Sequence, residues 1–239
     1  MRRFFVMQKF WRRILSVVLE ALFPAYCVGC GQEGGVLCVK CAQLLCWQKI
    51  ELCPLCRRVS SGGRVCDRCK PSSLSGVVSG FIYDEGGLVG KLIKSYKYDY
   101  QYEAGVSLGR LVCQQVQSMG DFFSQFECVV PIPLHRRRYA ERGFNQAEYF
   151  AEQIVSVSAS GCVVNCLRRV KNTPRQAGLG REERLQNLAQ AFVCNGDVRD
   201  KRVLLVDDVL TTGTTIVEAA RVLCIAGARE VWGYTVARG

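Results

Sequence analysis

One stretch near the C-terminus constrains the fold more than any other: residues 203–215 read VLLVDDVLTTGTT. The four apolar residues at its start suit a short strand buried on both faces, as in a parallel sheet. Two carboxylates follow, and the chain then turns through threonines and a glycine into a helical pattern over residues 216–226. A strand, a turn and a helix in that order are typical of an α/β domain.

The same stretch carries the parts of a sugar-phosphate site. Helix N-terminal N–H groups and the helix dipole favour an anion, and a glycine lets the backbone approach it closely. We expect the diol of a sugar on Asp207 and Asp208, and its phosphate in the turn. The alternative is an ordinary strand–turn–helix in which both carboxylates are caps. The turn residues are Thr211, Thr212, Gly213, Thr214 and Thr215.

The cysteines are the second informative pattern: nine of the 15 lie between residues 27 and 69. Four C-x-x-C pairs predict two tetrahedral zinc ions, each held by two pairs. Sequential and cross-braced pairing both fit the spacing. A disulfide framework or a redox role for one pair is the alternative. The eight candidate ligands are Cys27, Cys30, Cys38, Cys41, Cys53, Cys56, Cys66 and Cys69.

The first 26 residues combine an arginine-rich start with a short apolar run, as signal peptides do. Glu20 interrupts that run, no small-x-small cleavage site precedes Cys27, and the segment is too short and charged to span a bilayer. We expect no transmembrane segment. We expect instead an amphipathic helical arm that packs on its own protein or touches a membrane surface. The compartment is then cytoplasmic, with a peripheral place at the inner membrane in the second case.

Beyond the cysteines, a polar stretch at residues 71–76 marks a boundary. We therefore divide the chain into an arm (1–26), a double zinc ribbon (27–75) and an α/β domain (76–239). Strand and helix patterns alternate in the last part, which predicts a parallel sheet with helices on both faces and ligands beyond the C-terminal strand ends. The expected strands are 77–83, 128–132, 162–167, 191–194, 203–206 and 230–237, and the expected helices are 86–95, 102–116, 147–155 and 216–226.

Two further segments carry chemistry. Residues 129–146 read VVPIPLHRRRYAERGFNQ and place arginines in a loop beyond a strand end, where their forks match phosphate oxygens. Residues 169–192 form a long basic connection, interpreted as a lid that delivers Arg175 and Gln176, or else as a surface loop. The net charge of +11 favours phosphate-rich partners, or serves only solubility. The candidates for pyrophosphate contact in the first segment are Leu134, His135, Arg136 and Arg138.

These motifs together resemble the ComF/GntX family, in which a double zinc ribbon precedes a type I phosphoribosyltransferase domain. The resemblance implies that Asp207 and Asp208 hold the ribose hydroxyls of phosphoribosyl pyrophosphate (PRPP) and that residues 211–215 bind its 5-phosphate. Residues 134–138 would lie near the pyrophosphate, with Mg²⁺, and residues 169–187 would form a hood. The family is linked to natural transformation, so partners among DNA-uptake or recombination proteins are implied.

Function stays open between three hypotheses. The first is an enzyme that transfers ribose 5-phosphate to a nitrogenous acceptor, with Asp207, Asp208 and Arg175 as its catalytic residues. The second is a module that binds single-stranded DNA, favoured by the charge and the zinc ribbons. The third is a sensor that binds PRPP without chemistry. The sequence identifies neither an acceptor pocket nor a general base, although Asp208 is a candidate for the latter.

Overall fold

The computed structural model describes residues 24–99, 101–171 and 190–239 of the chain. The chain forms two compact units, Met1–Leu45 and Cys46–Gly239. The predicted arm over residues 1–26 lies almost entirely outside the described residues. The second half of the cysteine-rich region belongs to the same compact unit as the sheet, whereas the division of the chain at residues 26 and 75 stays a prediction.

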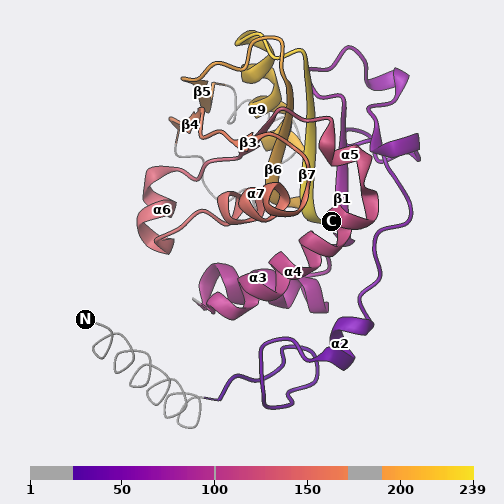
Figure 1. Cartoon of the computed structure of the whole chain (residues 1–239), viewed down its shortest axis with the longest axis vertical. Helices are drawn as coiled ribbons and strands as arrows, with labels where there is room; N and C mark the ends of the chain where they lie inside the picture. The colour runs from indigo at the N-terminus through magenta and orange to yellow at the C-terminus, as the bar shows by residue number, and fades with distance from the viewer. Residues whose placement is uncertain (1–23, 100, 172–189) are drawn as a thin grey trace, which may run out of the picture. The chain divides into compact units, whose positions relative to one another are not determined.

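The larger unit is built on a five-stranded sheet in which all neighbouring strands are parallel, in the order β1-β7-β6-β2-β3 (Figure 1). A separate antiparallel pair joins β4 (Leu167–Arg169) to β5 (Phe192–Cys194). The parallel sheet predicted from the alternating pattern is therefore confirmed. Its strands are β1 (Gly76–Ile82), β2 (Cys128–Pro131), β3 (Cys162–Val163), β6 (Arg202–Leu210) and β7 (Glu230–Arg238).

Helices cover both faces of this sheet because alternate residues of its inner strands point to opposite sides. On β7, Gly233 lies against Ile216 of α9. Its neighbour Tyr234 donates a hydrogen bond to Gln115 of α4 at 2.8 Å and packs on Phe123. The helices are α3 (Leu88–Tyr98), α4 (Tyr102–Met119), α5 (Asp121–Ser124), α6 (Arg136–Arg142), α7 (Gln146–Val157) and α9 (Thr214–Ile225).

Three elements differ from the sequence-based expectation. Strand β6 runs on to Leu210, so both carboxylates lie inside the strand, because β7 continues beside it and extends the ladder as far as the Leu210–Arg238 pair. The predicted loop after β2 contains helix α6, which His135 caps. The expected strand 162–167 is divided between β3 and β4, which belong to different sheets.

The segment with the third and fourth cysteine pairs is integrated with the sheet of its unit. Gln48 donates its backbone N–H to the carbonyl of Gly80 at 2.8 Å, and Trp47 stacks on Phe81 of β1. The guanidinium of Arg64 lies 5.1 Å from the ring centroid of Trp232 on β7. These contacts join the cysteine-rich segment to the two strands at one edge of the sheet.

Candidate functional site

The two carboxylates of the motif have different surroundings. Lys97, near the end of α3, pairs its ammonium with Asp208 at 2.5 Å, and both side chains are mostly buried, at 17 % and 15 % exposure. Asp207 accepts a hydrogen bond from the backbone N–H of Asp208 at 2.9 Å. One carboxylate therefore has a counter-ion, whereas the other depends on a backbone donor.

Burial raises the pKa of Asp207, and the neighbouring Asp208 raises it further, to about 7. The backbone N–H of Asp208 and the charges of Lys97 and Arg169 act in the opposite direction but do not cancel these effects. A carboxyl that shares a buried site with a second carboxyl holds its proton near neutral pH. A ligand that supplies hydroxyl donors or a cation would favour the ionised form.

The turn after β6 leads directly into α9. Gly213 is the N-cap residue at φ +76°, and it has no side chain with which to satisfy the first-turn N–H groups. Those groups can therefore meet an anion. The hydroxyls of Thr212 and Thr214 lie 2.9 Å apart in a mutual hydrogen bond. Thr211 is exposed, and Thr215 is half-buried on the first turn. The motif is thus a helix N-terminus without a cap side chain, and its N-cap residue Gly213 lies five residues beyond Asp208.

The basic groups predicted beyond β2 have different surroundings. Strand β2 pairs with β6 so that Pro131 lies opposite Val206, one residue before Asp207. Burial lowers the pKa of Arg169, Arg138 lowers it further and Asp207 raises it, so Arg169 lies near both of these groups. Of the predicted pyrophosphate contacts, Arg138 is thereby placed near Arg169.

The other residues of that segment differ in their burial and in their local partners. His135 accepts a hydrogen bond from the backbone N–H of Arg137 through Nδ1 at 3.3 Å and so caps α6. Arg136 is exposed, and Leu134 is half-buried. Arg142 donates to the hydroxyl of Tyr98 at 3.2 Å. Arg175 and Gln176, the predicted lid residues, lie outside the described residues.

Lys97 is the functional candidate that the sequence did not identify. It lies in a charged and aromatic stretch, KSYKYDYQY, which matches no phosphate-binding pattern. Its partner Asp208 is far away in sequence, and the contact exists only because α3 returns to the end of β6. The dense alternation of tyrosine and lysine was the only local signal, and such stretches also occur on ordinary helices.

A cavity of about 420 Å³ is lined in part by Tyr96, the residue before Lys97 in α3. The Tyr96 and Phe144 rings lie 4.9 Å apart, and Tyr96 meets Tyr149 edge-on at 6.0 Å. Glu148 and Glu152 add carboxylates to the wall. Such a cavity suits a flat ring that carries polar donors. Its aromatic lining consists of Tyr96, Tyr102, Tyr139, Phe144 and Tyr149.

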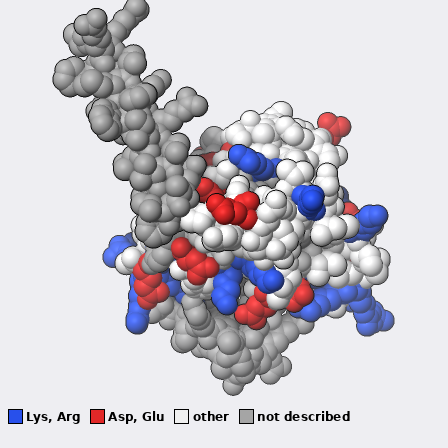
Figure 2. All heavy atoms as spheres, turned by 90° about the horizontal axis from the view of Figure 1, so that it is seen from below, with Lys and Arg blue, Asp and Glu red and all other residues white. Residues whose placement is uncertain are grey.

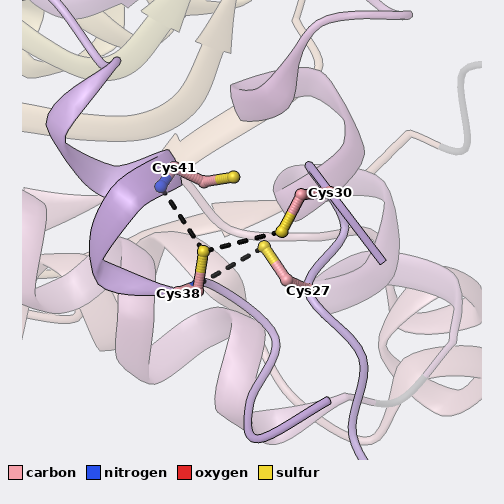
Figure 3. A group of neighbouring side chains, drawn as sticks. All are labelled: Cys27, Cys30, Cys38 and Cys41. Atoms are coloured by element: carbon pink, nitrogen blue, oxygen red, sulfur yellow. Dashed lines mark hydrogen bonds between the residues drawn. The ribbon is translucent and has the colours of Figure 1, made fainter. Parts of the chain in front are cut away.

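The cysteines form two groups, each made of consecutive C-x-x-C pairs, so the geometry matches sequential pairing. The ligand atoms of each group lie within 4.8 Å of one another. Figure 3 shows the four sulfurs of the first group turned toward a common centre. The first cysteine group is Cys27, Cys30, Cys38 and Cys41, and the second cysteine group is Cys53, Cys56, Cys66 and Cys69.

Backbone donors prepare both groups for a cation. Burial opposes ionisation of Cys27, but N–H groups, above all that of Cys38, outweigh it and lower the pKa to about 6. Burial likewise opposes ionisation of Cys53, whereas the N–H of Cys66, 3.5 Å from its Sγ, and other backbone donors lower the pKa to about 6. Four sulfur donors with one ready thiolate fit zinc, which binds Cys₄ sites tetrahedrally.

Comparisons with known proteins found a matching domain family and several relatives. The family described as "Phosphoribosyl transferase domain" matches residues 137–239. The chain is 35% identical to competence protein F of Haemophilus influenzae over 149 residues, 59% of this chain and just under two thirds (65%) of that protein. It is 30% identical to DNA utilization protein YhgH of Salmonella typhimurium over 205 residues, 82% of this chain and 88% of that protein.

More distant likenesses were also found. Competence protein ComFC of Streptococcus pneumoniae is 28% identical over 188 residues, 79% of this chain and 81% of that protein. Among solved structures, a purine phosphoribosyltransferase from Pyrococcus horikoshii Ot3 is 16% identical, with a TM-score of 0.32, over 56% of this chain and 84% of that chain. Within the described residues, every helix is too short or too polar to cross a membrane.

Proposed function

Because the chain belongs to the ComF family of competence and DNA-utilization proteins, we propose that it binds PRPP with Mg²⁺ and acts in DNA uptake on the cytoplasmic side. The observation that carries the proposal is the placement of Asp207 and Asp208 directly before the uncapped N-terminus of α9. Carboxylates suit a diol and helix N-terminal N–H groups suit a phosphate, so the two together suit one ribose 5-phosphate.

The charged residues support the pyrophosphate half of this ligand. Arg169 lies near Asp207, Arg138 lies near Arg169, and guanidinium forks suit phosphate oxygens. Oxygen ligands such as Asp207 and Asp208 suit Mg²⁺, which would neutralise the leaving pyrophosphate when bound. Lys97 is held on Asp208 and is available to the anion when a ligand hydroxyl takes that carboxylate.

The aromatic cavity lined by Tyr96, the residue before Lys97, supports an enzymatic role. In the transfer, the bond between the ribose C1 and the pyrophosphate oxygen breaks, and the pyrophosphate keeps the electron pair. A bond forms from C1 to a nitrogen of the acceptor, which loses its proton. The tyrosine rings of the cavity suit a planar acceptor, and Glu148 and Glu152 suit its N–H groups.

Calorimetry with PRPP and Mg²⁺ tests the binding proposal, with ribose 5-phosphate and pyrophosphate titrated separately. We expect PRPP to bind more tightly than either fragment and the double variant D207N/D208N to lose that advantage. Equal affinity for PRPP and for pyrophosphate alone would contradict the assignment of the ribose hydroxyls. Release of pyrophosphate with a panel of nitrogenous bases then tests the transferase.

A non-catalytic role is the second candidate, either as a PRPP sensor or in binding single-stranded DNA. The net charge of +11 and the names of the relatives favour it. However, acidic and basic side chains are intermingled on the face drawn in Figure 2. Binding of an oligothymidylate that weakens steeply with salt would support this role. PRPP binding without pyrophosphate release, for any base, would favour the sensor.

The cysteine groups are proposed to hold two structural zinc ions. The support is the donor set, in which each group offers four sulfurs within 4.8 Å of one another. Zinc would close two short segments that contain few strands or helices of their own. Metal analysis of the purified protein should find about two zinc ions per chain, the number that two Cys₄ sites require.

A further inference from the structure

The second cysteine group lies against the phosphate turn of the same unit. Arg57, the residue after Cys56, donates a hydrogen bond from Nη2 to the carbonyl of Thr211 at 3.0 Å. The carbonyl of Pro54 approaches Gly213 so closely that a Cβ there would lie 3.0 Å from it. The segment Pro54–Arg57, which contains Cys56, therefore contacts both ends of a three-residue turn.

The sheet anchors the same peptide. Arg238, at the end of β7, is buried and donates to the carbonyls of Leu52 and Cys53 at 2.9 and 2.8 Å. In the ladder, Arg238 lies opposite Leu210, the residue before Thr211. A single side chain thus fixes the first cysteine of the group beside the start of the turn.

The backbone turn around Cys53 and Cys56 fixes the position of Arg57. Its backbone has φ +64°, a left-handed conformation that is unfavourable for arginine. The backbone N–H of Arg57 donates to the carbonyl of Cys53 at 3.0 Å, and that of Cys53 donates to the carbonyl of Arg58 at 2.8 Å. This tight turn spans two of the metal ligands, so a metal that joins them to Cys66 and Cys69 would hold the strained conformation.

The charges beside the turn point to an anion. Arg57 donates to Thr211 at the start of the turn, and Arg238 donates to the neighbouring carbonyls of Leu52 and Cys53, so two like-charged guanidinium groups lie beside one turn and repel each other. Neither forms an ion pair with a carboxylate in the described part of the chain. An anion in the turn would relieve this repulsion.

We propose that Arg57 is a positioning residue through which the metal site of the second cysteine group holds the phosphate turn in its binding conformation. Metal binding at these cysteines and phosphate binding at the turn then reinforce each other, because coupling between two sites is reciprocal. The inference rests on the proposed function, since the turn must bind a phosphate for the coupling to be seen.

The first experiment measures PRPP affinity by calorimetry on full-length, zinc-loaded protein. We expect Arg57→Ala to weaken PRPP binding roughly 5- to 50-fold, with its zinc content unchanged. Arg57→Lys keeps the charge but loses the guanidinium fork, so its affinity for PRPP should lie between those of wild type and Arg57→Ala. Arg58→Ala is the control, because Arg58 is also exposed and its side chain forms no hydrogen bond or ion pair among the described residues.

The second experiment follows zinc transfer to a coloured chelator in a Cys30→Ser/Cys38→Ser background, which leaves only the second cysteine group as a site. PRPP should slow the loss of zinc when Arg57 is present and have little effect in the Arg57→Ala variant. Equal PRPP affinity of Arg57→Ala and wild type, or equal protection of zinc in both, would overturn the coupling. Failure of the proposed function would look different, because the wild-type protein itself would not bind PRPP.

Discussion

Replacement of Asp207 by asparagine should stabilise the ligand-free protein at pH 8. The same replacement should abolish the binding of PRPP. Asparagine has the shape of a protonated aspartic acid but never ionises. The pKa of Asp207 is raised from 3.8 to about 7, first by burial and then by Asp208. Because the folded state holds this proton more tightly than the unfolded state does, stability falls as the pH rises through about 7.

The size of the effect follows from the two pKa values. Between about pH 5.5 and about pH 8, ionisation of Asp207 alone lowers the free energy of unfolding by about 2 kcal/mol. In a domain of this size, that corresponds to roughly 4–8 °C in Tm. The loss should be missing from Asp207→Asn, so the advantage of the variant over wild type should be larger at pH 8 than at pH 5.5, by about 2 kcal/mol of unfolding free energy, and should vanish only below about pH 4.

Thermal denaturation across this pH range, with zinc present and Mg²⁺ absent, measures the difference directly. The matched control is Asp208→Asn. It removes the partner of Lys97 from a mostly buried ion pair and should therefore destabilise the protein at pH 8, by roughly 2–4 kcal/mol. The reasoning is refuted if Asp207→Asn lowers Tm at pH 8, or if its melting temperature keeps the wild-type dependence on pH.

Three further predictions test other parts of the structure. Gly213→Ala should cost about 1–2 kcal/mol of stability and weaken phosphate binding, since φ is +76° and the Pro54 carbonyl lies close; an unchanged urea midpoint and PRPP affinity would contradict this. Cys30→Ser should reduce the zinc content of the chain from two ions to one, whereas Cys46→Ser, which belongs to neither group, should leave it at two by metal analysis. Tyr139→Ala, which alters an exposed wall of the aromatic cavity, should leave PRPP affinity unchanged and lower the rate of pyrophosphate release with a base acceptor; equal rates would remove the cavity from the acceptor site.

Local pattern was enough to predict the strand, turn and helix around Gly213, because apolar runs and turn residues act over a few positions. Local pattern did not predict the C-terminal end of β6, since pairing with β7 extends the strand through Asp207 and Asp208. Residues 134–142 were predicted to be a loop because they follow the end of a strand, yet the N-cap contact of His135 starts a helix there. Spacing could not decide the pairing of the cysteines, because sequential and cross-braced arrangements both use C-x-x-C pairs.

Long-range contacts explain the remaining differences. Lys97 meets Asp208, and Arg57 meets Thr211, across more than a hundred residues in each case. Neither residue lies in a phosphate-binding motif, so single-sequence reasoning had no reason to select them. The motif predicts where the ligand's anion would lie, whereas the packing of α3 and of the second cysteine group decides which cations surround it.

The Lys97–Asp208 pair also limits how a ligand can enter. A diol or Mg²⁺ that takes Asp208 must replace a 2.5 Å ammonium contact, so binding exchanges one partner for another. The displaced ammonium is then free to meet a phosphate oxygen, and the exchange is favourable only for a ligand that carries both a hydroxyl or cation and an anion. Pyrophosphate alone supplies no replacement for Lys97, and a simple diol leaves the ammonium without a partner. We therefore expect the site to favour PRPP over pyrophosphate alone and over a simple diol, and the comparison of PRPP with pyrophosphate tests the carboxylate pair.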